Sequence, residues 1–179
     1  AYQNLGLILL NQGRYGEAID NLRRATELNP GYQEAHYYLG LALRDTGDTT
    51  GAIRHITRAV TLRPDYALAQ NDLGLILMNG GAIGEAKQHF KQAMAARPEF
   101  ALPYVNLGHA CLLGAERAEA QEAYDRALRA GYPVDELNYG IAMTFLQLGQ
   151  IGDAEAHFNE AIRIQDDYAV QGGRLPRPA

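Results

Sequence analysis

A repeat of 34 residues runs through the chain and limits what it can fold into. Two alanine positions mark the repeat most clearly, and each recurs in five successive units. They are Ala18, Ala52, Ala86, Ala120 and Ala154, and Ala25, Ala59, Ala93, Ala127 and Ala161. A fixed period of about this length is typical of stacked repeat arrays, whose units bury apolar surface only against their neighbours. The sequence therefore predicts an array with a long curved surface suited to binding other macromolecules.

Composition argues against several classes of function. The net charge is −5, so the chain as a whole offers no attraction to nucleic-acid phosphates or anionic lipids. The longest apolar run, Leu5–Leu10, is far shorter than the ~20 residues that a membrane helix needs. The only cysteine, Cys111, allows no internal disulfide. We expect no nucleic-acid partner and no membrane insertion.

The chain begins at Ala1 and Tyr2, already inside the first repeat and without an initiator methionine. We interpret it as a fragment of a longer protein, from which a targeting signal could have been removed. A cytoplasmic location is favoured, and a periplasmic one stays open on that ground.

Each unit contains two apolar patterns with helical spacing, separated by a short break. In the second unit Ala35, Leu39 and Ala42 share one helical face, which ends at Thr46–Asp48. The break usually holds a glycine suited to a left-handed C-cap, at Gly13, Gly47, Gly81 and Gly149, with Ala115 in the fourth unit. Recurring Gly and Ala predict a close approach of two helices. Larger residues are expected to fill the remaining space, namely Leu22, Ile56, Phe90, Tyr124 and Phe158.

The third unit shows the full motif of the repeat, with Leu73-Gly74, Leu77, Ala86, Phe90, Ala93 and Pro98. This order of residues resembles the tetratricopeptide repeat, and the resemblance covers residues 1–168. It implies an all-α fold, a right-handed α-solenoid of antiparallel helix pairs with a concave groove. We expect a single array over 1–168 with repeats near 1–32, 33–66, 67–100, 101–134 and 135–168, followed by a flexible C-terminal tail at 169–179.

The fifth unit departs from the motif, because Ala142 replaces the glycine and Asp166 replaces the proline. Its second helix is expected over Ile151–Ile164, with no following unit to cover its apolar residues. We expect residues 168–170 to fold back over that helix, and end-to-end self-association is the alternative cover.

The residues provide no recognisable catalytic or metal-binding constellation. His55, His89 and His157 recur at one position of their repeats, and neighbouring repeats lie too far apart to share an ion, since Zn–N bonds are ~2.0–2.1 Å. A packing or solvated role is favoured for them. Cys111 falls at a core position, which favours a buried apolar role over a reactive thiol, and the chain has no serine nucleophile. We expect no enzymatic activity, no cofactor and no metal.

The family resemblance also implies which positions of each first helix line the concave groove. The candidate partner-binding residues at those positions are Asn4, Leu7, Tyr37, Tyr38, Leu41, Arg44, Asn71, Asp72, Leu75, Met78, Val105, Asn106, His109, Tyr139 and Met143. Most are apolar or carry an amide, and exposed apolar patches mark interaction sites. Across all the groove positions, Arg44 is the only cation beside four carboxylates, so peptides with an acidic end are expected to bind poorly.

The sequence thus predicts a non-catalytic scaffold that binds a partner peptide or protein in the groove. The alternative is the substrate-recruiting arm of a larger enzyme, such as a glycosyltransferase similar to the O-linked N-acetylglucosamine transferases. In that family an asparagine ladder lines the superhelix, and Asn4 and Asn106 resemble two of its members, while Tyr38 and Gly140 interrupt it. An RNA-binding repeat is disfavoured, because the groove is net acidic.

Overall fold

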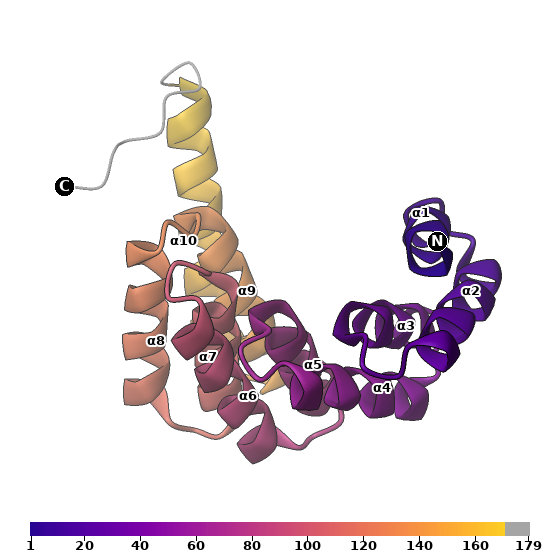
Figure 1. Cartoon of the computed structure of the whole chain (residues 1–179). Coiled ribbons are helices and arrows are strands. Elements are labelled where there is room, and N and C mark those ends of the chain that lie inside the picture. Colours follow the sequence, from indigo (N-terminus) through magenta and orange to yellow (C-terminus); the bar gives the residue numbers. More distant parts are fainter. Residues whose placement is uncertain (171–179) are drawn as a thin grey trace. The chain divides into compact units, whose positions relative to one another are not determined.

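The computed structural model describes residues 1–170, which form ten α-helices in five consecutive pairs (Figure 1). The pairs are α1 (Tyr2–Asn11) with α2 (Tyr15–Leu28), α3 (Gln33–Asp45) with α4 (Thr49–Leu62), α5 (Ala67–Asn79) with α6 (Ile83–Ala96), α7 (Leu102–Leu113) with α8 (Arg117–Arg129), and α9 (Val134–Gln147) with α10 (Ile151–Val170). The predicted all-α solenoid of antiparallel helix pairs is confirmed. None of the described helices is long and apolar enough to cross a bilayer.

The chain divides into two compact units, Ala1–Pro98 and Glu99–Ala179. Unit 1 holds α1 to α6, where α2 packs on α3 and α4 packs on α5. Unit 2 holds α7 to α10, where α7 packs on α9. In unit 1 α1 also packs on α3, and Tyr37 of α3 hydrogen-bonds to Asp72 of α5, so the first helices of successive repeats are neighbours within each unit. These helices carry the candidate binding residues.

The two helices of a pair approach most closely at the repeated glycine. A Cβ atom at Gly74 would lie 2.6 Å from Cε1 of Phe90, so only glycine leaves room for the ring. Gly108 leaves the same space for Tyr124. Phe90 is fully buried, as are Ala86 and Ala93 on the same helix. The predicted packing of small against large residues is confirmed, and burying the aromatic ring is a main source of stability in the third and fourth pairs.

The turn between the paired helices requires a left-handed residue. Gly47 takes φ 87° there, as the sequence predicts, and glycine pays no steric penalty in that region. In the fourth repeat Ala115 adopts φ 59°, although Gly114 directly precedes it. The chain geometry of the turn thus sets the position of the left-handed residue, and the neighbouring glycine does not move it.

In each of three repeats, a polar contact joins the first helix to the second helix. The two residues in contact are nineteen apart in sequence. Nδ1 of His55 lies 3.1 Å from Nδ1 of His36, and Nδ1 of His89 lies 2.7 Å from Oε1 of Gln70. In the fifth repeat Nδ1 of His157 lies 2.8 Å from Oδ1 of Asn138. These contacts are consistent with the packing or solvated role predicted for His55, His89 and His157, and each contact lies inside its own helix pair.

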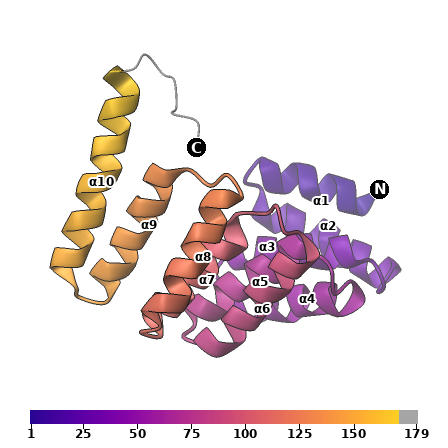
Figure 2. The same ribbon diagram turned by 90° about the vertical axis from the view of Figure 1, so that its left-hand side faces the viewer.

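The last helix differs from the sequence prediction. α10 runs from Ile151 through Val170, so the predicted end at Ile164 is wrong, and residues 168–170 continue the helix instead of folding back (Figure 2). Earlier repeats stop their second helix before a proline, which cannot extend a helix, whereas Asp166 retains its N–H and permits continuation. Gln165 donates to Asp135 near the start of α9 at 3.3 Å, so α10 projects past its partner helix. The rest of the predicted tail, residues 171–179, lies outside the described part of the chain.

Candidate partner-binding surface

The first helices of unit 1 are tied together side by side. α1 packs on α3, and the hydroxyl of Tyr37 in α3 donates to Asp72 in α5 at 2.7 Å. We call the accessible sides of α1, α3 and α5 the first-helix surface of unit 1, and those of α7 and α9 the first-helix surface of unit 2. The candidate residues with accessible side chains in unit 1 are Asn4, Leu7, Tyr38, Leu41, Arg44, Asp72, Leu75 and Met78.

Two candidates of unit 1 are buried, so they affect a partner only by positioning the Asp72 carboxylate. Tyr37 is 6% exposed and Asn71 is 3% exposed. Tyr37 donates to one oxygen of Asp72, and Asn71 donates to the other at 3.2 Å. Burial, followed by the charge of Asp72, raises the pKa of Tyr37, so the phenol stays protonated and remains a donor. The pair therefore fixes the orientation of the Asp72 carboxylate on the surface.

Two ion pairs involve charged side chains of the first helices of unit 1. Arg44 pairs with Asp45 at 2.8 Å, and Glu34 pairs with Arg63 at 3.1 Å. The guanidinium of Arg63 also lies 3.8 Å from the centre of the Tyr66 ring, a cation–π contact. These two ion pairs partly compensate the net acidity counted from the sequence, whereas Asp72 receives hydrogen bonds only from the neutral Tyr37 and Asn71 and keeps its charge. Apolar side chains are therefore the main groups that this surface offers to a binding partner.

The first-helix surface of unit 2 carries a run of exposed apolar side chains on α9. Tyr139, Met143 and Leu146 follow one side of α9 and are 57%, 46% and 39% exposed. They are four and three residues apart, which places them on one helical face. Val105 and Asn106 of α7 are buried, at 4% and 8% exposure, so these two candidates offer little surface to a partner. The stripe of Tyr139, Met143 and Leu146 is the largest apolar feature of the first helices of unit 2.

His109 joins α7 to α9 and is partly exposed. Its Nδ1 lies 3.0 Å from the hydroxyl of Tyr124 and 3.0 Å from Oγ1 of Thr144. Burial lowers the pKa of His109 to about 4, so the ring is neutral near pH 7. Its Nε2 faces Gly140, where a Cβ atom would approach to 3.0 Å. Gly140 thus interrupts the row of groove residues because the imidazole edge occupies the space.

Sequence reasoning missed the residues that hold the candidates in place. Arg63 contacts Glu34, which lies twenty-nine residues before it. Tyr32 donates to Gln3 at 2.5 Å, and Gln3 also lies twenty-nine residues before its partner. This spacing joins the start of a first helix to the residues after the second helix of the same repeat. A search at that spacing could have found both contacts. No comparable signal in the sequence pointed to Thr144 as a contact of His109.

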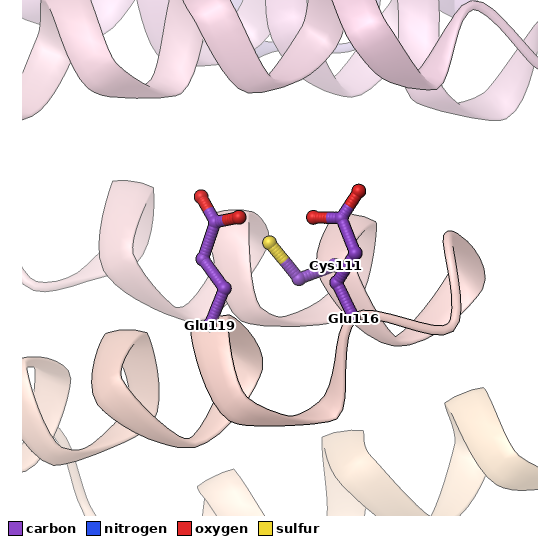
Figure 3. A group of neighbouring side chains, drawn as sticks. All are labelled: Cys111, Glu116 and Glu119. Carbon is purple, nitrogen blue, oxygen red and sulfur yellow. The ribbon is translucent and has the colours of Figure 1, made fainter.

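Cys111, Glu116 and Glu119 form the one group of three metal-ligand types found among the described residues (Figure 3). Their ligand atoms lie within 4.8 Å of one another, and Figure 3 shows the sulfur between the two carboxylates. Cys111 is fully buried, which confirms its predicted place in the core. Glu116 is the N-cap of α8 and Glu119 lies in its first turn, where the helix dipole favours acidic residues. Each residue therefore has a structural reason for its position.

Comparison with protein families gives a direct match. The sequence matches the tetratricopeptide repeat family over residues 4–67, 42–101 and 114–169, which is most of the chain. A search of curated protein sequences found no match.

Solved structures with the same fold are numerous. MamA from Desulfovibrio magneticus RS-1 is 22% identical, with 93% of this chain and 94% of that one covered and a TM-score of 0.77. TTC0263, a thermophilic tetratricopeptide protein of Thermus thermophilus, is 24% identical, with 90% and 89% covered and a TM-score of 0.68. PilF of Pseudomonas aeruginosa is 24% identical, with 89% of this chain and 74% of that one covered and a TM-score of 0.73. At such identities the likeness establishes the fold alone.

Proposed function

Because the chain belongs to the tetratricopeptide repeat family, we propose that it is a non-catalytic protein-interaction module that holds a partner peptide or protein against its first-helix surfaces. The observation that carries this proposal is the exposed stripe of Tyr139, Met143 and Leu146 on α9. Large apolar and aromatic side chains dominate the energetics of protein interfaces. A contiguous stripe of them at the surface is therefore an interaction site rather than a feature of folding.

The chemistry of the surface limits the partner. Tyr38, Leu41 and Leu75 in unit 1 give partly exposed apolar contacts, and Arg44 is already paired with Asp45. Asp72 and the exposed Glu136 of unit 2 repel acidic groups. The partner segment is therefore apolar at its anchors and neutral or basic between them. A segment that ends in acidic residues and a free carboxylate is disfavoured.

Self-association is an alternative use of the ends of the array. Ile162 on α10 is 56% exposed, whereas the residues at its repeat position in the second and third repeats, Val60 and Met94, are each 8% exposed. A helix from another molecule or from further chain would cover Ile162 in the same way. The enzyme-arm alternative has no comparable support, because Asn106 is 8% exposed and Asp72 replaces an asparagine of the ladder.

Peptides selected from a random displayed library against the purified chain provide a probe for the proposal. We expect the selected peptides to carry apolar anchors, and versions flanked by lysine to bind more tightly than versions flanked by glutamate. Replacing Tyr38, Leu75 and Met143 together by Ala should weaken binding at least about tenfold, or about 1.4 kcal/mol. Titration by fluorescence polarisation at low salt measures each dissociation constant.

The matched control replaces Gln88 and Gln92 by Ala, because both are exposed on the second helix α6. Binding should be unchanged in this variant, and the circular dichroism of both variants should match the parent. Equal binding by the triple variant and the parent, or tighter binding of glutamate-flanked peptides, would contradict the proposal.

A further inference from the structure

His36 on α3 and His55 on α4 bring two imidazole nitrogens together. Their Nδ1 atoms lie 3.1 Å apart, and their rings are 5.3 Å apart between centres with planes inclined by 23°. The chain has five histidines, and the other three contact Gln70, Asn138, or Tyr124 with Thr144. The pair forms within one repeat, so it escapes the argument that equivalent histidines of different repeats are too far apart to share an ion.

The outer nitrogen of His36 is already oriented. Nε2 of His36 lies 3.2 Å from the carbonyl oxygen of Pro30. A carbonyl only accepts, so Nε2 carries the hydrogen and the lone pair of Nδ1 faces His55. In the metal-free protein His55 then donates its Nδ1–H to His36. A histidine that ligates a metal usually donates its other N–H to a carbonyl or carboxylate, which is the arrangement His36 already has.

The separation of the two nitrogens suits neighbouring ligands of one ion. Two nitrogens bound at ~2.0–2.1 Å and separated by angles of about 90–110° lie roughly 2.9–3.4 Å apart. We propose that His36 and His55 form a two-histidine site for a divalent transition-metal ion, with Cu²⁺ preferred over Ni²⁺ and Zn²⁺. When the ion binds, His55 moves its hydrogen from Nδ1 to Nε2, so both Nδ1 atoms donate to the metal and no proton is released. Water completes the coordination, because His55 is partly exposed.

The surroundings of the pair act in two opposite ways. Burial lowers the pKa of His36, and it lowers the pKa of His55 to about 4, so both rings are neutral and able to bind a metal near pH 7. The charges that act on the pair are Arg58 for His36, and Arg54, Arg23 and Asp48 for His55. Three cations against one carboxylate repel a metal ion. Binding should therefore tighten as salt screens the arginines, the reverse of a site held by carboxylates.

The third repeat supplies a matched control for the test. Gln70 stands at the position of His36, with Oε1 2.7 Å from Nδ1 of His89, and its Nε2 donates to the carbonyl of Pro64 at 2.9 Å. The variant His36→Gln should therefore keep both contacts and the fold while losing one metal ligand. The reciprocal variant Gln70→His should create a second pair with His89.

Isothermal titration of the untagged chain with Ni²⁺, in a buffer that does not coordinate metals, tests the proposal. We expect one ion for the parent, at least about tenfold weaker binding for His36→Gln, and two ions for Gln70→His. Affinity for the parent should rise with ionic strength, and Mg²⁺ should not compete because it prefers oxygen ligands. Unchanged binding in His36→Gln, no saturable binding by the parent, or a single ion in Gln70→His would each overturn the proposal. Matching circular dichroism of the variants and parent excludes misfolding as the cause of a loss.

Discussion

The third and fifth repeats can be compared position by position, and they differ most clearly in which side chains are exposed. Asn71 in α5 is 3% exposed, whereas Tyr139 at the same position of α9 is 57% exposed. Met94 in α6 is 8% exposed, whereas Ile162 in α10 is 56% exposed. The third repeat therefore buries its side chains at these two positions, and the fifth presents apolar side chains there on both of its helices.

The cores of the two repeats differ as well. Phe90 lies fully buried against Gly74, while Phe158 is only partly buried in the repeat that has Ala142 in place of the glycine. The ring of Phe158 also contacts Tyr139 at 5.6 Å between centres, so it supports the exposed stripe of α9. The comparison teaches that the repeat positions specify the helix pair, and that burial of its outer side chains depends on a further helix packed against them, which Ile162 lacks among the described residues.

The largest expected effect comes from removing the core phenylalanine of the third and fifth repeats. Phe90→Ala should lower the free energy of unfolding by about 3–5 kcal/mol, because it empties a fully enclosed site. Phe158→Ala should cost less than about 2 kcal/mol, because its ring is already partly exposed. Urea denaturation monitored by circular dichroism gives both values. Equal costs would break the contrast between the two cores.

The second effect concerns pH and the contact between α7 and α9. His109 stands where the third repeat has Leu75, and burial lowers its pKa to about 4 from a usual value near 6.5. Between these values the unfolded chain binds a proton that the folded chain does not. The stabilising contribution is therefore fully present above about pH 6.5, and it is lost as the pH falls toward 4. The loss amounts to roughly 2–3 kcal/mol.

The variant His109→Gln tests this pH dependence, because the amide does not titrate and can still accept from Tyr124. Stability curves between pH 7 and 4 should be flatter for the variant than for the parent. Parallel curves would show that His109 titrates normally in the folded chain.

The smallest effect on stability comes from substitutions at the position where the two helices of a pair approach most closely, Gly74 in the third repeat and Ala142 in the fifth. Gly74→Ala should cost about 1–3 kcal/mol, because the added Cβ would lie 2.6 Å from the ring of Phe90. Ala142→Gly should cost no more than about 1 kcal/mol, the helix-propensity difference between the two residues, because the fifth repeat already holds a Cβ at this position beside a partly exposed Phe158. Thermal unfolding compares the two. A cost for Ala142→Gly as large as that for Gly74→Ala would contradict the account of the fifth core.

Much of the fold could be predicted because each repeat places a small residue opposite a large one and a left-handed residue at the turn. Gly74 with Phe90 and the left-handed Gly47 follow directly from their repeat positions. The end of α10 could not be predicted, because the absence of a proline at Asp166 permits a longer helix without determining where it stops. The burial of Tyr37 and Asn71 was missed for a different reason. Family positions indicate the side of a helix, whereas burial depends on the particular neighbours, here Tyr66 and Asp72.

The most direct test of the central claim compares two first-helix variants with the same selected peptide. One variant replaces Tyr139, Met143 and Leu146 by Ala in the fifth repeat, and the other replaces Leu75 and Met78 by Ala in the third. Dissociation constants measured by fluorescence polarisation decide between them. We predict at least a tenfold weakening for the fifth-repeat variant and a smaller one for the third, because the fifth repeat exposes the larger apolar stripe. Undiminished binding by the fifth-repeat variant would contradict the account.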